Sequence, residues 1–174
     1  MSSVPAQKKR EAVFQILFSL GMGDTNQESM ELLLSKELGM SRINVGQAFQ
    51  RALAVLDAVI TIDEQIGEVS KTYDIARISS VEKAVLRLGV YELILDKDIP
   101  PKVAIAEAVR LTRKFSSPQA AAFVNALLDA IYKKSLGIAP DAQMLEESAK
   151  ELQLSQEIAE EASQEVRKDD DDTN

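Results

Sequence analysis

The chain has 174 residues, 45% of them apolar, and a formal net charge of −8. This length fits one domain of ordinary size, and no apolar run reaches membrane-spanning length, so we expect a globular protein in the cytoplasm, not in a membrane. Cysteine and histidine are absent, which excludes disulfides, thiolate or imidazole metal sites, and catalysis built on either side chain. No Gly-rich phosphate loop is present. We therefore expect a binding protein, not an enzyme, without metal or cofactor.

The negative charge is concentrated near the C-terminus. Residues 141–174 hold 12 acidic and three basic residues, whereas residues 1–140 hold 16 acidic and 17 basic residues. We therefore expect a body over residues 1–140 and an acidic tail that is partly helical or disordered, with a solvated "DDDDTN" end. The tail either folds back over a basic surface as a polyanion mimic or acts as a solubilising extension.

The N-terminal part of the chain has the apolar periodicity of helices. A first helix is predicted over residues 7–20, with an apolar face formed by Val13, Phe14, Leu17 and Phe18. A second, short helix follows a capping-box pattern that starts at Thr25, and it ends near Gly39. A long periodic region begins at Ser41. We divide it into two helices near residues 60–63, where β-branched residues gather.

The following part of the chain predicts three more helices. Ser79 begins a capping-box pattern before one of them. "DKDIPP" predicts a turn, because proline disfavours helix before it and Pro101 suits a first helical position. The next helix ends near Phe115, and Ser117 caps the last helix of the body. About seven helices with short connections predict a compact all-α bundle.

Lys8, Lys9 and Arg10 form the densest basic run of the chain. They lie at the start of a predicted helix, where the helix dipole opposes positive charge, so helix stability does not account for them. One hypothesis is that these side chains bind the phosphates of a polyanion. The alternative is an ordinary solvated N-terminus.

Arg113 and Lys114 directly precede Phe115 at the junction between two predicted helices. An aromatic ring can stack on an unpaired base, and free backbone amides at the start of the next helix can bind the phosphate of that nucleotide. The alternative is structural, because basic residues in the last helical turn are favoured in any protein. Asn125, in the next helix, is expected to be a buried amide that bonds a neighbouring helix backbone.

Four ordered segments resemble the NusB family of bacterial transcription antitermination factors: "REAVFQILF" (10–18), "EKAVLRLGVYEL" (82–93), "DIPPKVAIAEAVRLTRKF" (98–115) and "FVNALLD" (123–129). The resemblance spans about residues 8–135. It implies an all-helical fold of two small subdomains. It also implies a non-enzymatic adaptor that binds boxA-type single-stranded RNA of ribosomal RNA leaders together with the small ribosomal subunit protein NusE. Through that complex it would act with RNA polymerase and other Nus factors.

The resemblance also implies roles for individual residues. The expected RNA contacts are Lys8, Lys9, Arg10, Phe18, Arg113, Lys114, Phe115, Ser116, Ser117 and Phe123. The expected contacts with the protein partner are Glu82, Arg87 and Tyr91. Phe18 replaces the usual tyrosine, and the acidic tail has no counterpart in the common family pattern. The alternative is therefore an interaction module of the same fold, such as a homodimer or a regulatory subunit, with little RNA binding.

Overall fold

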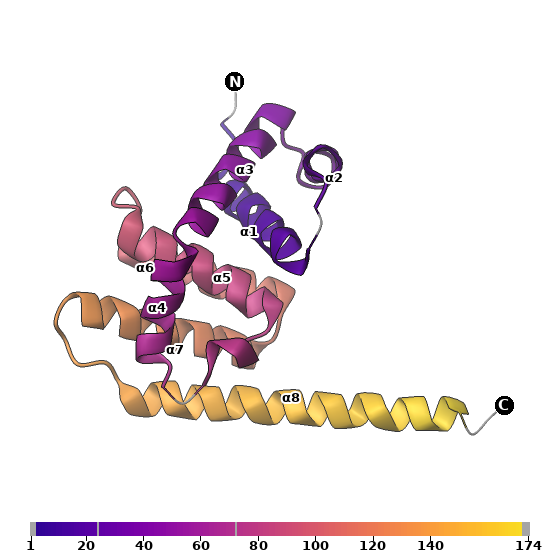
Figure 1. Cartoon of the computed structure of the whole chain (residues 1–174), viewed down its shortest axis with the longest axis vertical. Helices are drawn as coiled ribbons and strands as arrows, with labels where there is room; N and C mark the ends of the chain where they lie inside the picture. Colours follow the sequence, from indigo (N-terminus) through magenta and orange to yellow (C-terminus); the bar gives the residue numbers. More distant parts are fainter. Residues whose placement is uncertain (1–2, 24, 72, 172–174) are drawn as a thin grey trace.

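The computed structural model describes residues 3–23, 25–71 and 73–171, with side chains up to residue 167 (Figure 1). Within these ranges all regular structure is helical, as the sequence predicts. The first group of helices is α1 (Ala6–Met22), α2 (Gln27–Leu38) and α3 (Arg42–Asp57). α3 packs along α1, and α2 covers one side of the pair. Their shared core contains the fully buried Ile16, Leu34 and Val45.

The second group is α4 (Val59–Val69), the short 3₁₀ turn η1 (Ile75–Arg77), α5 (Ser80–Val90), the π-helical turn η2 (Tyr91–Leu95), α6 (Pro101–Phe115) and α7 (Pro118–Ser135). α5 contacts α1, α6 and α7, so it joins the two groups. Its close packing depends on Gly89, where an added Cβ would lie 3.0 Å from Leu128 Cδ1 and 3.4 Å from Ala108 Cβ. The arrangement agrees with the expected bundle of two small subdomains.

Several helix ends lie where the sequence predicts them. The side chains of Ser41 and Ser117 accept hydrogen bonds from backbone amides at the starts of α3 and α7. Gly39 follows α2 in the left-handed conformation, which glycine adopts without steric cost. Two expectations were wrong in detail. Asn26, not Thr25, caps α2, and the helix break lies at Ala58 instead of residues 60–63.

The C-terminal region forms one long helix, α8 (Ala142–Asp171). Its first half packs on α7 through Leu145, Ala149 and Leu152, and Tyr73 Oη donates to Gln156 Oε1 at 2.9 Å. Its second half extends away from the body (Figure 1). Within the described residues, α8 therefore does not fold back over Lys8 to Arg10. The end of "DDDDTN" lies outside the described residues.

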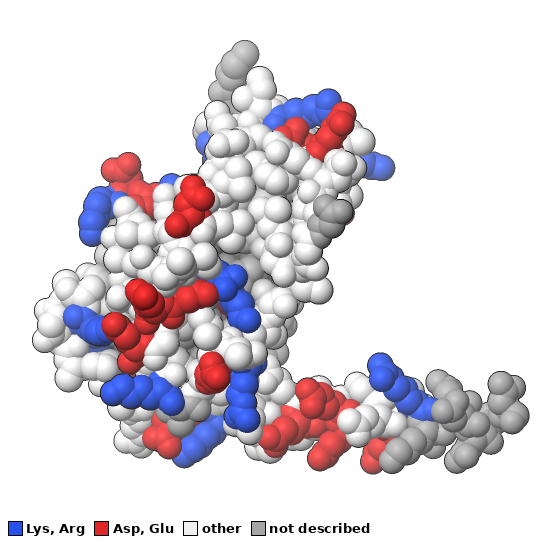
Figure 2. Space-filling model, viewed as in Figure 1, with Lys and Arg blue, Asp and Glu red and all other residues white. Residues whose placement is uncertain are grey.

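Acidic side chains gather on the projecting part of α8, whereas the body carries charges of both signs on the same face (Figure 2). Among the described residues, no single helix is long and apolar enough to cross a membrane. α3 and α4 pass that test only as a pair, and they are bent by 60° relative to each other.

Candidate nucleic-acid interface

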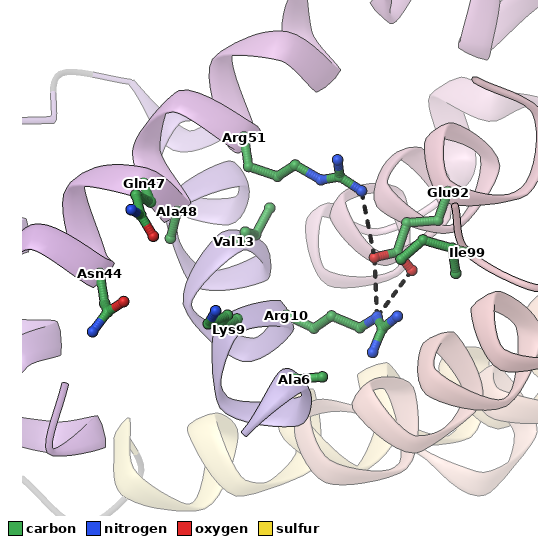
Figure 3. Close-up of a pocket in the computed structure, with 10 residues that line it drawn as sticks. All are labelled: Ala6, Lys9, Arg10, Val13, Asn44, Gln47, Ala48, Arg51, Glu92 and Ile99. Atoms are coloured by element: carbon green, nitrogen blue, oxygen red, sulfur yellow. Dashed lines mark hydrogen bonds and ion pairs between the residues drawn. The ribbon is translucent and has the colours of Figure 1, made fainter. Parts of the chain in front are cut away.

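The three residues of the N-terminal basic run have different surroundings. Lys8 and Lys9 are exposed on the first turns of α1, and neither forms an ion pair within the described residues. Arg10 turns inward, and its Nε donates to both carboxylate oxygens of Glu92 at 3.0 and 3.1 Å (Figure 3). Only 11% of its side chain is exposed. The run therefore presents two lysines to solvent, while the arginine joins α1 to η2.

Glu92 is the centre of an ion-pair network. Its carboxylate is also 4.0 Å from a terminal nitrogen of Arg51, which bonds Asp96 and lies 4.9 Å from the centre of the Tyr91 ring. Burial raises the pKa of Glu92, and the charge of Arg10 opposes that rise. The hydrogen bond from Arg51 lowers the pKa of Asp96. The carboxylates thus neutralise most of the positive charge that the two arginines bring to this region.

A pocket of about 340 Å³ lies beside this network, between α1 and α3 (Figure 3). Its walls combine polar side chains with small or aliphatic ones. They are formed by Ala6, Lys9, Val13, Asn44, Gln47 and Ala48, with Arg10, Arg51, Glu92 and Ile99. The pocket opens beside the exposed Lys9, so it belongs to the same end of the molecule as the basic run.

A second set of predicted contacts comes together where α6 meets α1. The Phe14 ring lies 4.8 Å from the Phe115 ring and 6.4 Å from the Phe18 ring, centre to centre. Lys114 Nζ lies 2.7 Å from Glu11 Oε1 and 5.3 Å from the centre of the Phe115 ring. Phe18 and Phe115 are half-buried. Phe115 packs α6 against α1 through Phe14, and both half-buried rings still present part of their surface to solvent.

The junction between α6 and α7 is held by two serines. Ser116 Oγ bonds the carboxylate of the buried Glu82, and Ser117 Oγ accepts from the amide of Ala120 at 3.1 Å. Arg113 beside it is exposed and forms no ion pair within the described residues. We call the set Phe18, Arg113, Lys114, Phe115, Ser116 and Ser117 the junction surface. It meets α1 at Glu11 and Phe14 and includes Phe18, and these residues are two, five and nine residues along the helix from Lys9.

Phe123 does not belong to this surface. It is 0% exposed and packs edge-on against Tyr73, with ring centres 5.3 Å apart. The expectation that it contacts RNA was wrong for this structure, because the apolar face of α7 on which it lies is turned into the core. Asn125 is only half-buried, and its side chain forms no hydrogen bond within the described residues. The expected structural role of its amide therefore has no support here.

The three residues expected to contact a protein partner make internal contacts with different elements. Glu82 is 2% exposed and bonds Ser116, while its other carboxylate oxygen is buried without a hydrogen-bond partner in the described residues. Arg87 donates to both carboxylate oxygens of Asp63 at 2.9 and 2.7 Å. Tyr91 lies under Arg51. Arg87 also lines a polar pocket of about 260 Å³ with Phe18. Their contact with a partner stays a prediction.

Sequence reasoning missed Glu92 and Arg51, which organise the pocket. A usable signal existed, because Glu92 interrupts the apolar run at 88–95 and a buried carboxylate requires a cationic partner. Its partners Arg10 and Arg51 precede it by 82 and 41 residues, so only the fold identifies them. Within the described residues there is no group of three or more acidic side chains able to hold a metal ion.

The fold is shared with solved NusB structures. A solved structure of T. maritima NusB matches with a TM-score of 0.63 and 27% identity over 84% of this chain and 99% of that chain. A structure of antitermination factors NusB and NusE in complex with dsRNA matches with a TM-score of 0.63 and 27% identity, over 74% of this chain and 96% of that one.

Sequence comparison agrees with this likeness. The NusB family model matches residues 7–133. The transcription antitermination protein NusB of Oceanobacillus iheyensis is 39% identical over 127 residues, which are 71% of this chain and 95% of the relative. NusB of Chlamydia pneumoniae is 34% identical over 131 residues, or 75% and 82% of the two chains. The chain belongs to the NusB family.

Proposed function

We propose that this protein is a transcription antitermination factor that binds boxA-type single-stranded RNA together with the small ribosomal subunit protein NusE. The RNA would be a ribosomal RNA leader, still attached to RNA polymerase in the cytoplasm. Other Nus factors would join the complex indirectly. The role is binding and not catalysis, and no cofactor takes part.

One observation carries the proposal. Two exposed lysines without ion-pair partners in the described residues lie at the start of α1, and a half-exposed Phe115, beside the capped start of α7, packs against Phe14 further along the same helix. Cations bind phosphates regardless of sequence, and an aromatic ring stacks on an unpaired base. Lys9 and Phe14, which packs against Phe115, are separated by about 7.5 Å along α1, so one RNA strand can contact both groups. The relative solved with NusE and dsRNA supports both an RNA and a protein partner.

The test is an affinity measurement by fluorescence anisotropy. The full chain is titrated into a boxA-type single-stranded RNA, with and without NusE, and into the matching duplex. We expect binding to the single strand that tightens when NusE is present. Tighter binding to the duplex would show that the protein prefers double-stranded RNA and would contradict the proposed single-stranded ligand. Binding of NusE without any effect on RNA affinity would favour the alternative, an interaction module with little RNA binding.

A further inference from the structure

The pocket between α1 and α3 has features that the binding of phosphates does not require. We propose that it holds one unpaired nucleobase of the bound RNA, and this inference rests on the proposed function. At about 340 Å³ it lies at the lower end of the size range of small-ligand sites, roughly 300–1,000 Å³. That volume suits one heterocycle with part of its ribose.

The walls match the two surfaces of a base. Ala6, Val13, Ala48 and Ile99 supply apolar contacts for the faces of a planar ring. Arg51 supplies a planar guanidinium, the other kind of group on which unpaired bases stack. The ring faces of a base can therefore leave water without loss of polar contacts.

The polar side chains of the pocket offer both donors and acceptors to the edge of a base. Gln47 is exposed at the rim, and its amide forms no hydrogen bond within the described residues. Asn44 Nδ2 donates to Ser41 Oγ at 2.8 Å, which leaves Asn44 Oδ1 as an acceptor. Arg10 uses Nε for Glu92, so its two terminal amino groups have no protein partner in the described residues. Nucleobase edges carry the same mixture of donors and acceptors.

The charges around the pocket favour a neutral occupant over an anion. Both guanidinium groups of the pocket are already paired, Arg10 with Glu92 and Arg51 with Asp96. A carboxylate or phosphate deep in the pocket would meet Glu92 without a free cation to offset it. Lys9 at the rim is the unpaired positive charge, and it lies where the phosphate of a base in the pocket would emerge. A neutral heterocycle inside the pocket and a phosphate at its rim fit this distribution of charged side chains.

The experiment combines protein variants with abasic RNA. The affinity of the full chain with NusE is measured for the single-stranded boxA-type RNA and for a series in which each position in turn lacks its base. Gln47→Ala removes an exposed pocket amide, and Gln50→Ala is the matched control, because Gln50 is exposed on the same helix and is not among the pocket residues. A second variant, Ala6→Phe, fills the pocket from an exposed position.

We expect Gln47→Ala to weaken binding of the complete RNA about fivefold, the size of one hydrogen bond, and Gln50→Ala to leave it unchanged. Ala6→Phe should weaken it at least as much. At one position the abasic RNA should bind equally well to wild type and Gln47→Ala, because the contact is already lost.

Two other outcomes overturn the inference and are distinguishable. If wild type binds RNA and Lys9→Ala weakens it, but no abasic position cancels the effect of Gln47→Ala, the pocket holds no base while the proposed function stands. If wild type binds none of the RNAs with or without NusE, the proposed function fails and the inference fails with it. Circular dichroism of each variant confirms that the helices are intact.

Discussion

Arg10 and Lys9 are neighbours in the sequence but have different tasks. The guanidinium of Arg10 is directed to the buried Glu92, and the ammonium of Lys9 faces solvent at the rim of the pocket. From the sequence alone, both residues are predicted to contact phosphates as members of one basic run. We therefore expect substitution of Arg10 to change mainly stability and substitution of Lys9 to change mainly the positive charge available to RNA.

We predict that Arg10→Ala lowers the free energy of unfolding by about 3 kcal/mol at pH 7–8, because it leaves the carboxylate of Glu92 buried and poorly paired. Lys9→Ala, the matched control, should change it by less than about 0.5 kcal/mol. Urea unfolding followed by circular dichroism measures both values. Equal effects of the two substitutions would contradict the assignment of Arg10 to a buried ion pair and of Lys9 to the solvent-exposed surface.

The same variant has a predicted pH dependence. Burial raises the pKa of Glu92, and removal of Arg10 takes away the charge that opposes this rise. An acid whose pKa is raised by folding costs stability above that pKa, where it must be ionised, and the cost disappears as it becomes protonated. The deficit of Arg10→Ala should therefore shrink as the pH falls through the raised pKa of Glu92. Glu92→Gln in the Arg10→Ala background should remove this pH dependence.

At the scale of the helix, α5 is the element on which the packing of both groups depends. Gly89 faces α6 and α7 with Leu128 Cδ1 at 3.0 Å from the position of an added Cβ, whereas nothing lies within 4 Å of that position at Gly67 on α4. The sequence places Gly46, Gly67 and Gly89 inside helical patterns. Only the structure distinguishes Gly89, which packs closely, from Gly67, which does not.

We predict that Gly89→Val destabilises the protein by about 1–3 kcal/mol, because the larger side chain forces Leu128 and Ala108 to move. Gly67→Ala, in open space on α4, should stabilise it by about 0.5–1 kcal/mol, because alanine favours helix over the unfolded chain. Thermal and urea unfolding measure both changes. Destabilisation by Gly67→Ala would show that α4 is packed differently.

The second element-scale prediction concerns α8, which begins beyond residue 133, where the family match ends. Leu152 is 2% exposed against the body, whereas Leu154 is 58% exposed. Leu152→Ala should lower the free energy of unfolding by about 2–3 kcal/mol, and Leu154→Ala should leave it nearly unchanged. Hydrogen exchange should show protection in the first half of α8 that is lost in Leu152→Ala. Equal, small effects of the two substitutions would mean that α8 is not docked on α7.

Local sequence signals predicted local features well. Ser41, Gly39 and Ser117 were placed correctly because a cap depends on residues within one helical turn. The burial of Phe123 and the pairing of Arg10 with Glu92 were missed because the surroundings of both residues depend on residues far along the chain. An aromatic residue in a binding motif and one in the core look the same until the helix face that enters the core is known.

At the scale of the whole molecule, the acidic excess lies on the projecting half of α8, whereas the body carries charges of both signs (Figure 2). The end with Lys8, Lys9 and the pocket lies far from the acidic, projecting half of α8 (Figures 1 and 2). This arrangement leaves the N-terminal lysines accessible in the described structure. It gives no support to a tail that shields them, so the solubilising role of the tail is the simpler expectation.

The most direct test of the account is the salt dependence of RNA binding. The double variant Lys8→Ala/Lys9→Ala is compared with Lys133→Ala/Lys150→Ala, which removes the same charge from α7 and α8, away from the start of α1. For single-stranded RNA each lost phosphate contact reduces the slope of log K against log salt by about 0.7, so we predict a loss of about 1.4 for the first variant and none for the second. Equal slopes for both variants and wild type would contradict the claim that the N-terminal lysines bind RNA.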